Sequence, residues 1–168
     1  MSPTSAHGFG PPSPPFADWP VQLIDARIGY LWFVAPNVLV DQAHVRHGTV
    51  ETAHALHDWI DRLQAARRAD IDAAGGLVAV HDWRSLRGYD APARRAYQDR
   101  MRARPKGYLQ AAYVVVPSTP LLRMAVEAGN LAAQIGSGGR VALAADPSEL
   151  LARLGVQRPA STASFPGR

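Results

Sequence analysis

The chain has 168 residues, of which 47% are hydrophobic and 19% charged, and its formal charge is +4. This length fits one domain with a hydrophobic core, and the composition excludes a wholly disordered chain. The sequence contains no cysteine, which excludes disulfides, thiolate metal sites and cysteine nucleophiles.

Three features that are missing from the sequence bear on the cellular location of the protein. It has no basic, apolar N-terminal leader and no run of the roughly 20 apolar residues that a spanning helix needs. The absence of cysteine suits a reducing compartment. We therefore expect a cytoplasmic protein without a transmembrane segment.

Both ends of the chain are predicted to be tails around one domain at residues 21–156. Residues 1–20 contain six prolines, which fix the backbone and remove hydrogen-bond donors, so a disordered tail is predicted there. Residues 157–168 are polar and contain two prolines, which predicts a flexible C-terminal tail.

Between the tails, the hydrophobic pattern predicts alternating strands and helices. Thr49 and Asp146 are predicted helix caps, and Gly75 with Gly76 stops the first helix. In chain order the pattern gives strands at 21–25 and 30–35, extended structure at 38–45, a helix at 49–74, a strand at 77–82, a helix at 91–104, a strand at 108–116, a helix at 119–135, a strand at 141–144 and a helix at 147–154.

The order β-β-α-β-α-β-α-β-α indicates the α/β class. Strands that alternate with helices form a mainly parallel sheet with right-handed crossovers. We expect about five strands covered by about four helices.

Two stretches resemble a known family. They are the strand at 77–83 with the loop at 84–90, and the strand at 140–144 followed by the helix at 147–154. Together with the element order over residues 21–156, they resemble the STAS superfamily, named for sulfate transporters and anti-sigma-factor antagonists, and its SpoIIAA-like branch. The resemblance implies a STAS-like sheet and a non-enzymatic regulatory module that binds another protein.

The family's phosphorylation switch is missing from its usual place. In the antagonists, a strand ends in aspartate and a second aspartate opens an Asp-Ser-Ser-Gly turn whose serine is phosphorylated. Asp82 and Asp90 match the two aspartates, but Ala91 and Pro92 stand where the serines would be. The resemblance therefore implies a module without that switch, and Ser85 is better explained as a turn residue.

Positive charge marks the predicted partner-binding surface. Residues 1–83 hold five basic and nine acidic side chains, whereas residues 84–168 hold thirteen basic and five acidic ones. This asymmetry favours an acidic protein partner, and a solvated helix face explains it as well. No nucleic-acid motif is present, and a homodimer is left open. The predicted residues are Asp82, Arg84, Arg87, Asp90, Arg94, Arg95 and Arg102.

A second hypothesis is an apolar small-molecule or lipid-binding protein. Relatives with this fold include CRAL-TRIO-like lipid carriers, and the chain has aromatic and methionine side chains that could line a pocket. An ordinary core explains the same residues. The predicted pocket residues are Trp32, Trp59, Tyr97 and Met101, with Phe33 beside them.

A third hypothesis is an enzyme that uses His81 and Asp82. Open α/β sheets bind ligands at the carboxyl ends of their strands, where these two residues lie. A histidine there can act as a general base. Adjacent strand residues point to opposite faces, however, so His81 and Asp82 are not expected to pair.

The spacing of two histidines raises the question of a metal site. His54 and His57 share a helix face, but Asp58 and Asp61 follow them by four residues, so helical His–Asp pairing explains the spacing. Zinc sites need three or four converging ligands. We expect no metal and no cofactor, and residues 136–139 (Gly-Ser-Gly-Gly) are expected to be a turn after a helix rather than a phosphate loop.

Overall fold

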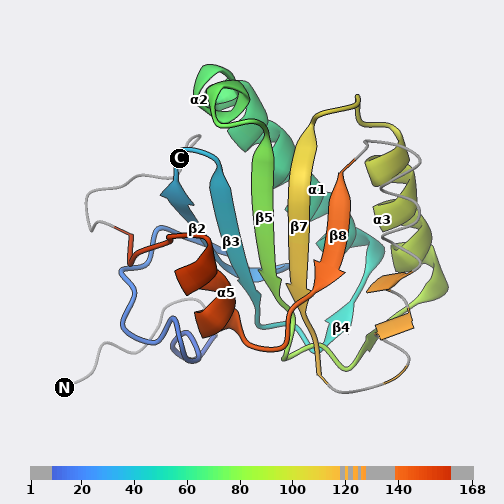
Figure 1. Ribbon diagram of the computed structural model, residues 1–168. Helices are drawn as coiled ribbons and strands as arrows, with labels where there is room; N and C mark the ends of the chain where they lie inside the picture. Colours follow the sequence, from blue (N-terminus) through green and yellow to red (C-terminus); the bar gives the residue numbers. More distant parts are fainter. Residues whose placement is uncertain (1–8, 118–119, 121–122, 125, 128–138, 160–168) are drawn as a thin grey trace.

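The computed structural model describes residues 9–117, 120, 123–124, 126–127 and 139–159, and shows an α/β fold (Figure 1). One sheet has the strand order β1-β2-β3-β5-β7-β8. Strands β3, β5, β7 and β8 pair in parallel, whereas β1, β2 and β3 pair antiparallel. The strands are β1 (Leu23–Asp25), β2 (Gly29–Ala35), β3 (Val38–Ala43), β5 (Leu77–Asp82), β7 (Leu109–Val115) and β8 (Arg140–Leu143).

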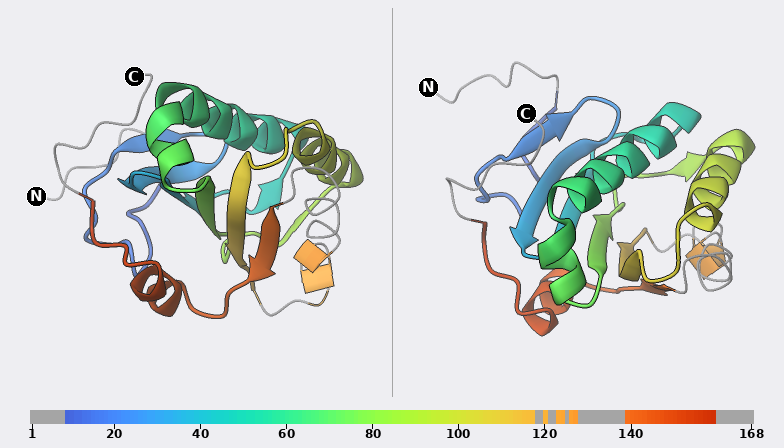
Figure 2. Two further views of the ribbon diagram at one scale, coloured as in Figure 1. Left: turned by 45° about the horizontal axis from the view of Figure 1, so that its top comes forward. Right: turned by 90° about the horizontal axis from the view of Figure 1, so that it is seen from above.

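Helices cover both faces of this sheet (Figure 2). Helices α1 (Val50–Ala66), α2 (Arg68–Ala73) and α3 (Ala91–Arg102) lie on one face. Helix α5 (Pro147–Arg153) lies on the other, next to the N-terminal segment. No helix in the described ranges is long and apolar enough to cross a membrane.

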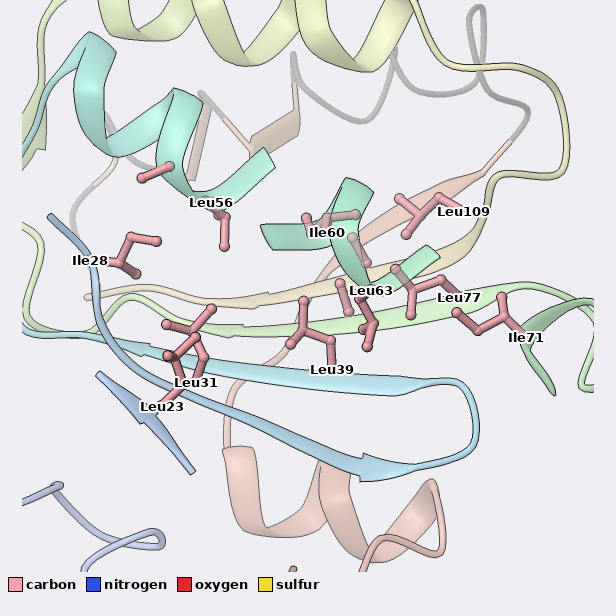
Figure 3. Packing of buried hydrophobic residues seen from close by; sticks show 13 residues of the cluster. Leu23, Ile28, Leu31, Leu39, Leu56, Ile60, Leu63, Ile71, Leu77 and Leu109 are labelled. Atoms are coloured by element: carbon pink, nitrogen blue, oxygen red, sulfur yellow. The ribbon is translucent and has the colours of Figure 1, made fainter. Parts of the chain in front are cut away.

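The core between α1 and the sheet follows from the helical spacing of the apolar residues. Leu56, Ile60 and Leu63 lie three or four residues apart and are at most 3% exposed. Figure 3 shows them pointing toward Leu39 and Leu77 on the strands below. Helix α1 begins at Thr49, whose side chain accepts a hydrogen bond from the backbone of Thr52.

Strands β3 and β5 are the central strands and are buried along their whole length. Parallel strands with both faces covered usually read as apolar runs. Each of these strands nevertheless has two consecutive polar residues in its C-terminal half, and the parallel register places Asp41 opposite His81 and Gln42 opposite Asp82. The candidate site is built on the first of these pairs.

The predicted α/β fold with a mainly parallel sheet is confirmed, with three differences in detail. The sheet has six strands rather than about five, because the extended segment at 38–45 is a central strand. Strands β4 (His47–Gly48) and β6 (Gly88–Tyr89) form a second small sheet that was not predicted. The helix predicted at 49–74 is interrupted at Arg67, which has non-helical backbone angles, and nothing in the sequence marks this break.

Two predictions reach beyond the described residues. The helix predicted at 119–135 and most of the glycine turn at 136–139 lie largely outside them, although residues 120, 123–124 and 126–127 are helical. The predicted C-terminal tail is described only to Pro159, which is buried.

The N-terminal segment departs from the disordered tail predicted for residues 1–20. Of this stretch the structure describes residues 9–20, and they pack on the sheet. Phe16 is 0% exposed, with its ring centroid 4.8 Å from that of Trp19 and 5.3 Å from that of Trp32. The prediction counted prolines and overlooked the aromatic residues among them. Burial of such rings offsets the entropy of ordering a chain that proline already restricts.

Candidate functional site

A cavity of about 100 Å³ lies between helices α1 and α3 and strands β5, β7 and β8. Most of its wall is aliphatic or aromatic, so water gains few hydrogen bonds inside it. Its described lining residues are Leu56, His57, Ile60, Ala79, His81, Trp83, Tyr89, Arg94, Tyr97, Gln98, Met101, Arg104, Leu109, Ala112, Val114, Val126 and Val141.

A buried carboxylate fixes the orientation of His81 in this wall. Asp41 is 0% exposed, and its Oδ1 is hydrogen-bonded to Nδ1 of His81. Its Oδ2 accepts a hydrogen bond of 3.1 Å from Nε1 of Trp83. A tryptophan can only donate, so the carboxylate acts as acceptor for both rings. The arrangement joins β3 to β5 and to the loop after β5.

The carboxylate also selects the tautomer of His81. If Nδ1 carries the hydrogen that binds Asp41, the lone pair of a neutral ring lies on Nε2. In the described part of the chain, Nε2 makes no hydrogen bond, while His81 lines the cavity. On a neutral His81 ring, Nε2 is therefore an acceptor whose direction is fixed by the hydrogen bond to Asp41.

A second histidine in the wall has no polar partner. His57 is 3% exposed, and neither of its ring nitrogens is hydrogen-bonded to a described residue. Burial is the main reason that the pKa of His57 falls well below its usual value, with nearby Arg104 adding to the effect, so the ring is neutral at pH 7. Leaving buried polar atoms unpaired costs about 1–3 kcal/mol for each group.

Tyr97 lines the cavity from the side of α3. Its ring centroid lies 5.5 Å from that of His57 and 5.6 Å from that of Trp83. Burial raises the pKa of Tyr97 well above the usual value, so its hydroxyl stays protonated. Aromatic rings thus surround both histidines.

Asp61 on α1 forms hydrogen bonds and ion pairs with residues of α3 and of the segment after it, and these contacts connect two sides of the cavity wall. Its Oδ2 accepts a hydrogen bond of 2.7 Å from Arg100, and its Oδ1 accepts one of 3.0 Å from Arg104 and another from the Tyr108 hydroxyl. Arg104 also donates to the backbone carbonyl of His57, at 3.3 Å. The expected pairing of Asp58 and Asp61 with histidines is not what the structure has, because the ion pairs described for both carboxylates are to arginines.

The predicted partner-binding residues separate into two groups. Asp82 is only 2% exposed: it pairs with Arg84 at 2.7 Å and accepts a hydrogen bond of 2.7 Å from Gln42. Arg84 reaches the backbone carbonyl of Pro14, so this pair holds the N-terminal segment. Asp90 is exposed and caps α3. The other predicted residues, Arg87, Arg94, Arg95 and Arg102, are exposed.

Some of the predicted pocket residues line the cavity, and the others lie elsewhere in the fold. Tyr97 and Met101 line the cavity. Trp32 lies on the opposite face of the sheet against Phe16, and Trp59 donates a hydrogen bond of 2.8 Å to Asp25. Phe33 packs at the edge of the core on the α1 side, under Arg67. Helical spacing placed Tyr97 and Met101 together, but it could not assign Trp32 to a face.

The expectation that His81 and Asp82 would not pair is confirmed. His81 turns to Asp41 on one face of the sheet, and Asp82 turns to Arg84 on the other. Sequence reasoning overlooked Asp41, whose signal was a lone carboxylate in the apolar run of β3. Within the described ranges, no group of three or more potential metal ligands is close enough to hold an ion. His54 is exposed whereas His57 is buried.

Comparison of the chain with known proteins identifies no similar protein. No protein-family model matches the chain, and neither a curated protein nor a solved structure matches it.

Proposed function

We propose that the chain binds a small, mainly apolar molecule in the cavity between α1 and α3. The observation that carries this proposal is His57, a buried imidazole with both nitrogens unpartnered among the described residues, in the wall of an apolar cavity. Natural proteins pair nearly all buried polar groups, and unpaired ones cluster where function requires them. A ligand in the cavity makes apolar contacts with this wall and supplies polar partners to the side chains that face the cavity.

The size of the cavity limits the ligand class. Its volume of about 100 Å³ is comparable with the roughly 150 Å³ of an engineered apolar cavity that binds benzene. A single ring or a short branched chain therefore fits, whereas a lipid acyl chain does not fit without movement of the walls. Small-molecule sites typically combine such apolar walls with a few oriented polar groups.

Filling the cavity should weaken ligand binding. Ala112 lines it, whereas the neighbouring Ala111 points to the opposite face of β7. We expect Ala112→Leu to weaken the binding of toluene, measured by NMR titration of the full chain, at least tenfold. Ala111→Leu should leave the affinity unchanged, although each added side chain costs about 1–3 kcal/mol of stability by overpacking.

Thermal melting of both alanine variants supplies the folding control. If Ala112→Leu does not fold, Ala79→Val makes a smaller change at another lining position. Equal toluene affinity in the wild type and in a folded cavity-filled variant would rule out this cavity as the binding site.

A second candidate function is the binding of an acidic protein, as the STAS resemblance implies. It is favoured by Arg87 and Arg95, which are exposed and form no ion pair with any described residue. Exposed, unpaired arginines keep their charge available for carboxylates on a partner. These two residues lie on the β6–α3 part of the surface and outside the cavity wall.

Charge reversal separates this candidate from the first. Arg87→Glu with Arg95→Glu should weaken the binding of an oligoglutamate peptide at least tenfold at low salt, because attraction becomes repulsion. Fluorescence anisotropy measures the affinity, and Arg153→Glu on α5 is the control for net charge. If the control weakens binding as much as reversal of one of these arginines, the surface has no local specificity for acidic partners.

A further inference from the structure

The polar end of the cavity identifies the ligand more closely. Asp41 holds His81 through Nδ1, so a neutral His81 ring presents Nε2 as an acceptor to the cavity, whose wall is mostly apolar. An acceptor of this kind is satisfied only by a donor on the ligand. Carboxylates, ethers and ketones offer acceptors alone and would leave Nε2 unpaired, whereas a hydroxyl group donates.

We propose that the cavity takes a small cyclic or branched molecule bearing a hydroxyl group, which donates its hydrogen bond to Nε2 of His81. The proposal rests on the proposed function, since it names the class of ligand for the same cavity. The apolar part of the ligand packs against the aliphatic wall formed by α1 and the strands. Its hydroxyl lies at the Asp41–His81 pair.

The supporting structure around His81 explains why the acceptor keeps its direction. Both oxygens of Asp41 are occupied, one by His81 and one by Trp83, so the carboxylate cannot turn away without breaking two hydrogen bonds. The Trp83 ring also lies beside the imidazole, with ring centroids 5.2 Å apart. An acceptor fixed in this way requires little reorganisation when the ligand enters, which favours discrimination.

Phenol and toluene provide a matched pair of probes, because they differ only by a hydroxyl in place of a methyl group. Isothermal titration of the full chain should show phenol binding at least about tenfold more tightly than toluene. Benzoate should bind more weakly than phenol, because its carboxylate brings no donor to Nε2. Equal affinity for phenol and toluene, or tightest binding of benzoate, would overturn the proposal.

Two substitutions of His81 separate its two nitrogens. Asn places an amide near the position of Nδ1 and keeps a donor for Asp41, but it has no group at the position of Nε2. Gln reaches toward the Nε2 position with a carbonyl acceptor. We expect His81→Asn to abolish the preference for phenol over toluene and His81→Gln to retain part of it, so the ratio of the two affinities, rather than either affinity alone, is the measured quantity.

A measurement on the unmodified chain covers the case in which these variants do not fold. Nitrogen-15 NMR of the His81 ring should show a protonated Nδ1, and phenol should shift the Nε2 resonance while toluene does not. A ring protonated on Nε2 would overturn the proposal. If toluene and phenol both fail to bind, the proposed function fails with it; if toluene binds as well as phenol and is lost in Ala112→Leu, only the hydroxyl assignment fails.

Discussion

Asp41→Ala should lower the free energy of unfolding by about 3–5 kcal/mol. Asp41 is completely buried and accepts hydrogen bonds from His81 and Trp83. Alanine would leave both ring donors without a partner and open a space between β3 and β5. Each effect is costly in a close-packed interior, and here they occur together. Urea unfolding monitored by tryptophan fluorescence measures the loss.

Two controls separate this effect from the loss of an ordinary carboxylate. Asp58→Ala removes a half-exposed partner of Arg100, and it should cost less than about 1 kcal/mol because water screens the pair. Asp41→Asn keeps the volume and one acceptor oxygen, so it should cost less than alanine. A loss for Asp41→Ala no larger than that for Asp58→Ala would show that the Asp41–His81–Trp83 cluster does not stabilise the fold.

The Asp41→Asn variant also bears on ligand selection. Its side-chain amide can donate to Nδ1 of His81, which moves the ring hydrogen to Nε2. The cavity would then present a donor rather than an acceptor. If the folded Asp41→Asn variant carries the His81 ring hydrogen on Nε2, the Asp41 carboxylate determines whether the cavity presents an acceptor or a donor to its ligand.

The elements that could be predicted from the sequence are those specified by local signals. Strand β5 follows Gly75 and Gly76 and is a continuous apolar run, so its bounds were predicted correctly at 77–82. Thr49 and Asp146 cap helices where predicted, because a side-chain oxygen that satisfies a free backbone N–H acts over only two or three residues. Each of these signals depends on neighbouring residues alone.

The candidate site could not be predicted in the same way, because its central pair joins residues 40 positions apart. Whether Asp41 meets His81 depends on the register between β3 and β5, and a shift of one strand by one residue would place the two side chains on opposite faces of the sheet. The sequence did contain a usable signal. Asp41 interrupts the apolar run of β3, and a carboxylate in a buried strand requires a partner.

Two of the predicted partner-binding residues make contacts inside the chain. Asp82 and Arg84 were expected to face a partner, but the structure uses them to hold the chain's own N-terminal segment. The backbone N–H of Ser13 donates to Gln42 at 2.7 Å, and Gln42 donates to Asp82 in turn. The hydrogen-bond partners of Arg84 and Gln42 therefore include Pro14 and Ser13, which belong to the segment that was predicted to be disordered.

Phe16→Ala tests that segment directly and should lower the free energy of unfolding by about 3–4 kcal/mol. The Phe16 side chain is 0% exposed, packs against the rings of Trp19 and Trp32, and belongs to a buried cluster that also includes Leu150 of α5. Its truncation leaves a space that these rigid rings cannot fill. Denaturant unfolding measures the loss, and hydrogen exchange should show faster exchange at Trp19, whose backbone N–H is bonded to the Phe16 carbonyl.

Phe9→Ala is the matched control, since Phe9 is only half-buried and its ring touches His44. It should cost about 1 kcal/mol or less, because water already reaches much of its side chain. If residues 9–20 were a disordered tail, both substitutions would leave the stability unchanged. A large loss confined to Phe16 would instead make the segment part of the core on the face opposite the cavity, and ligand affinity in the cavity should then be the same in the Phe16 variant as in the wild type.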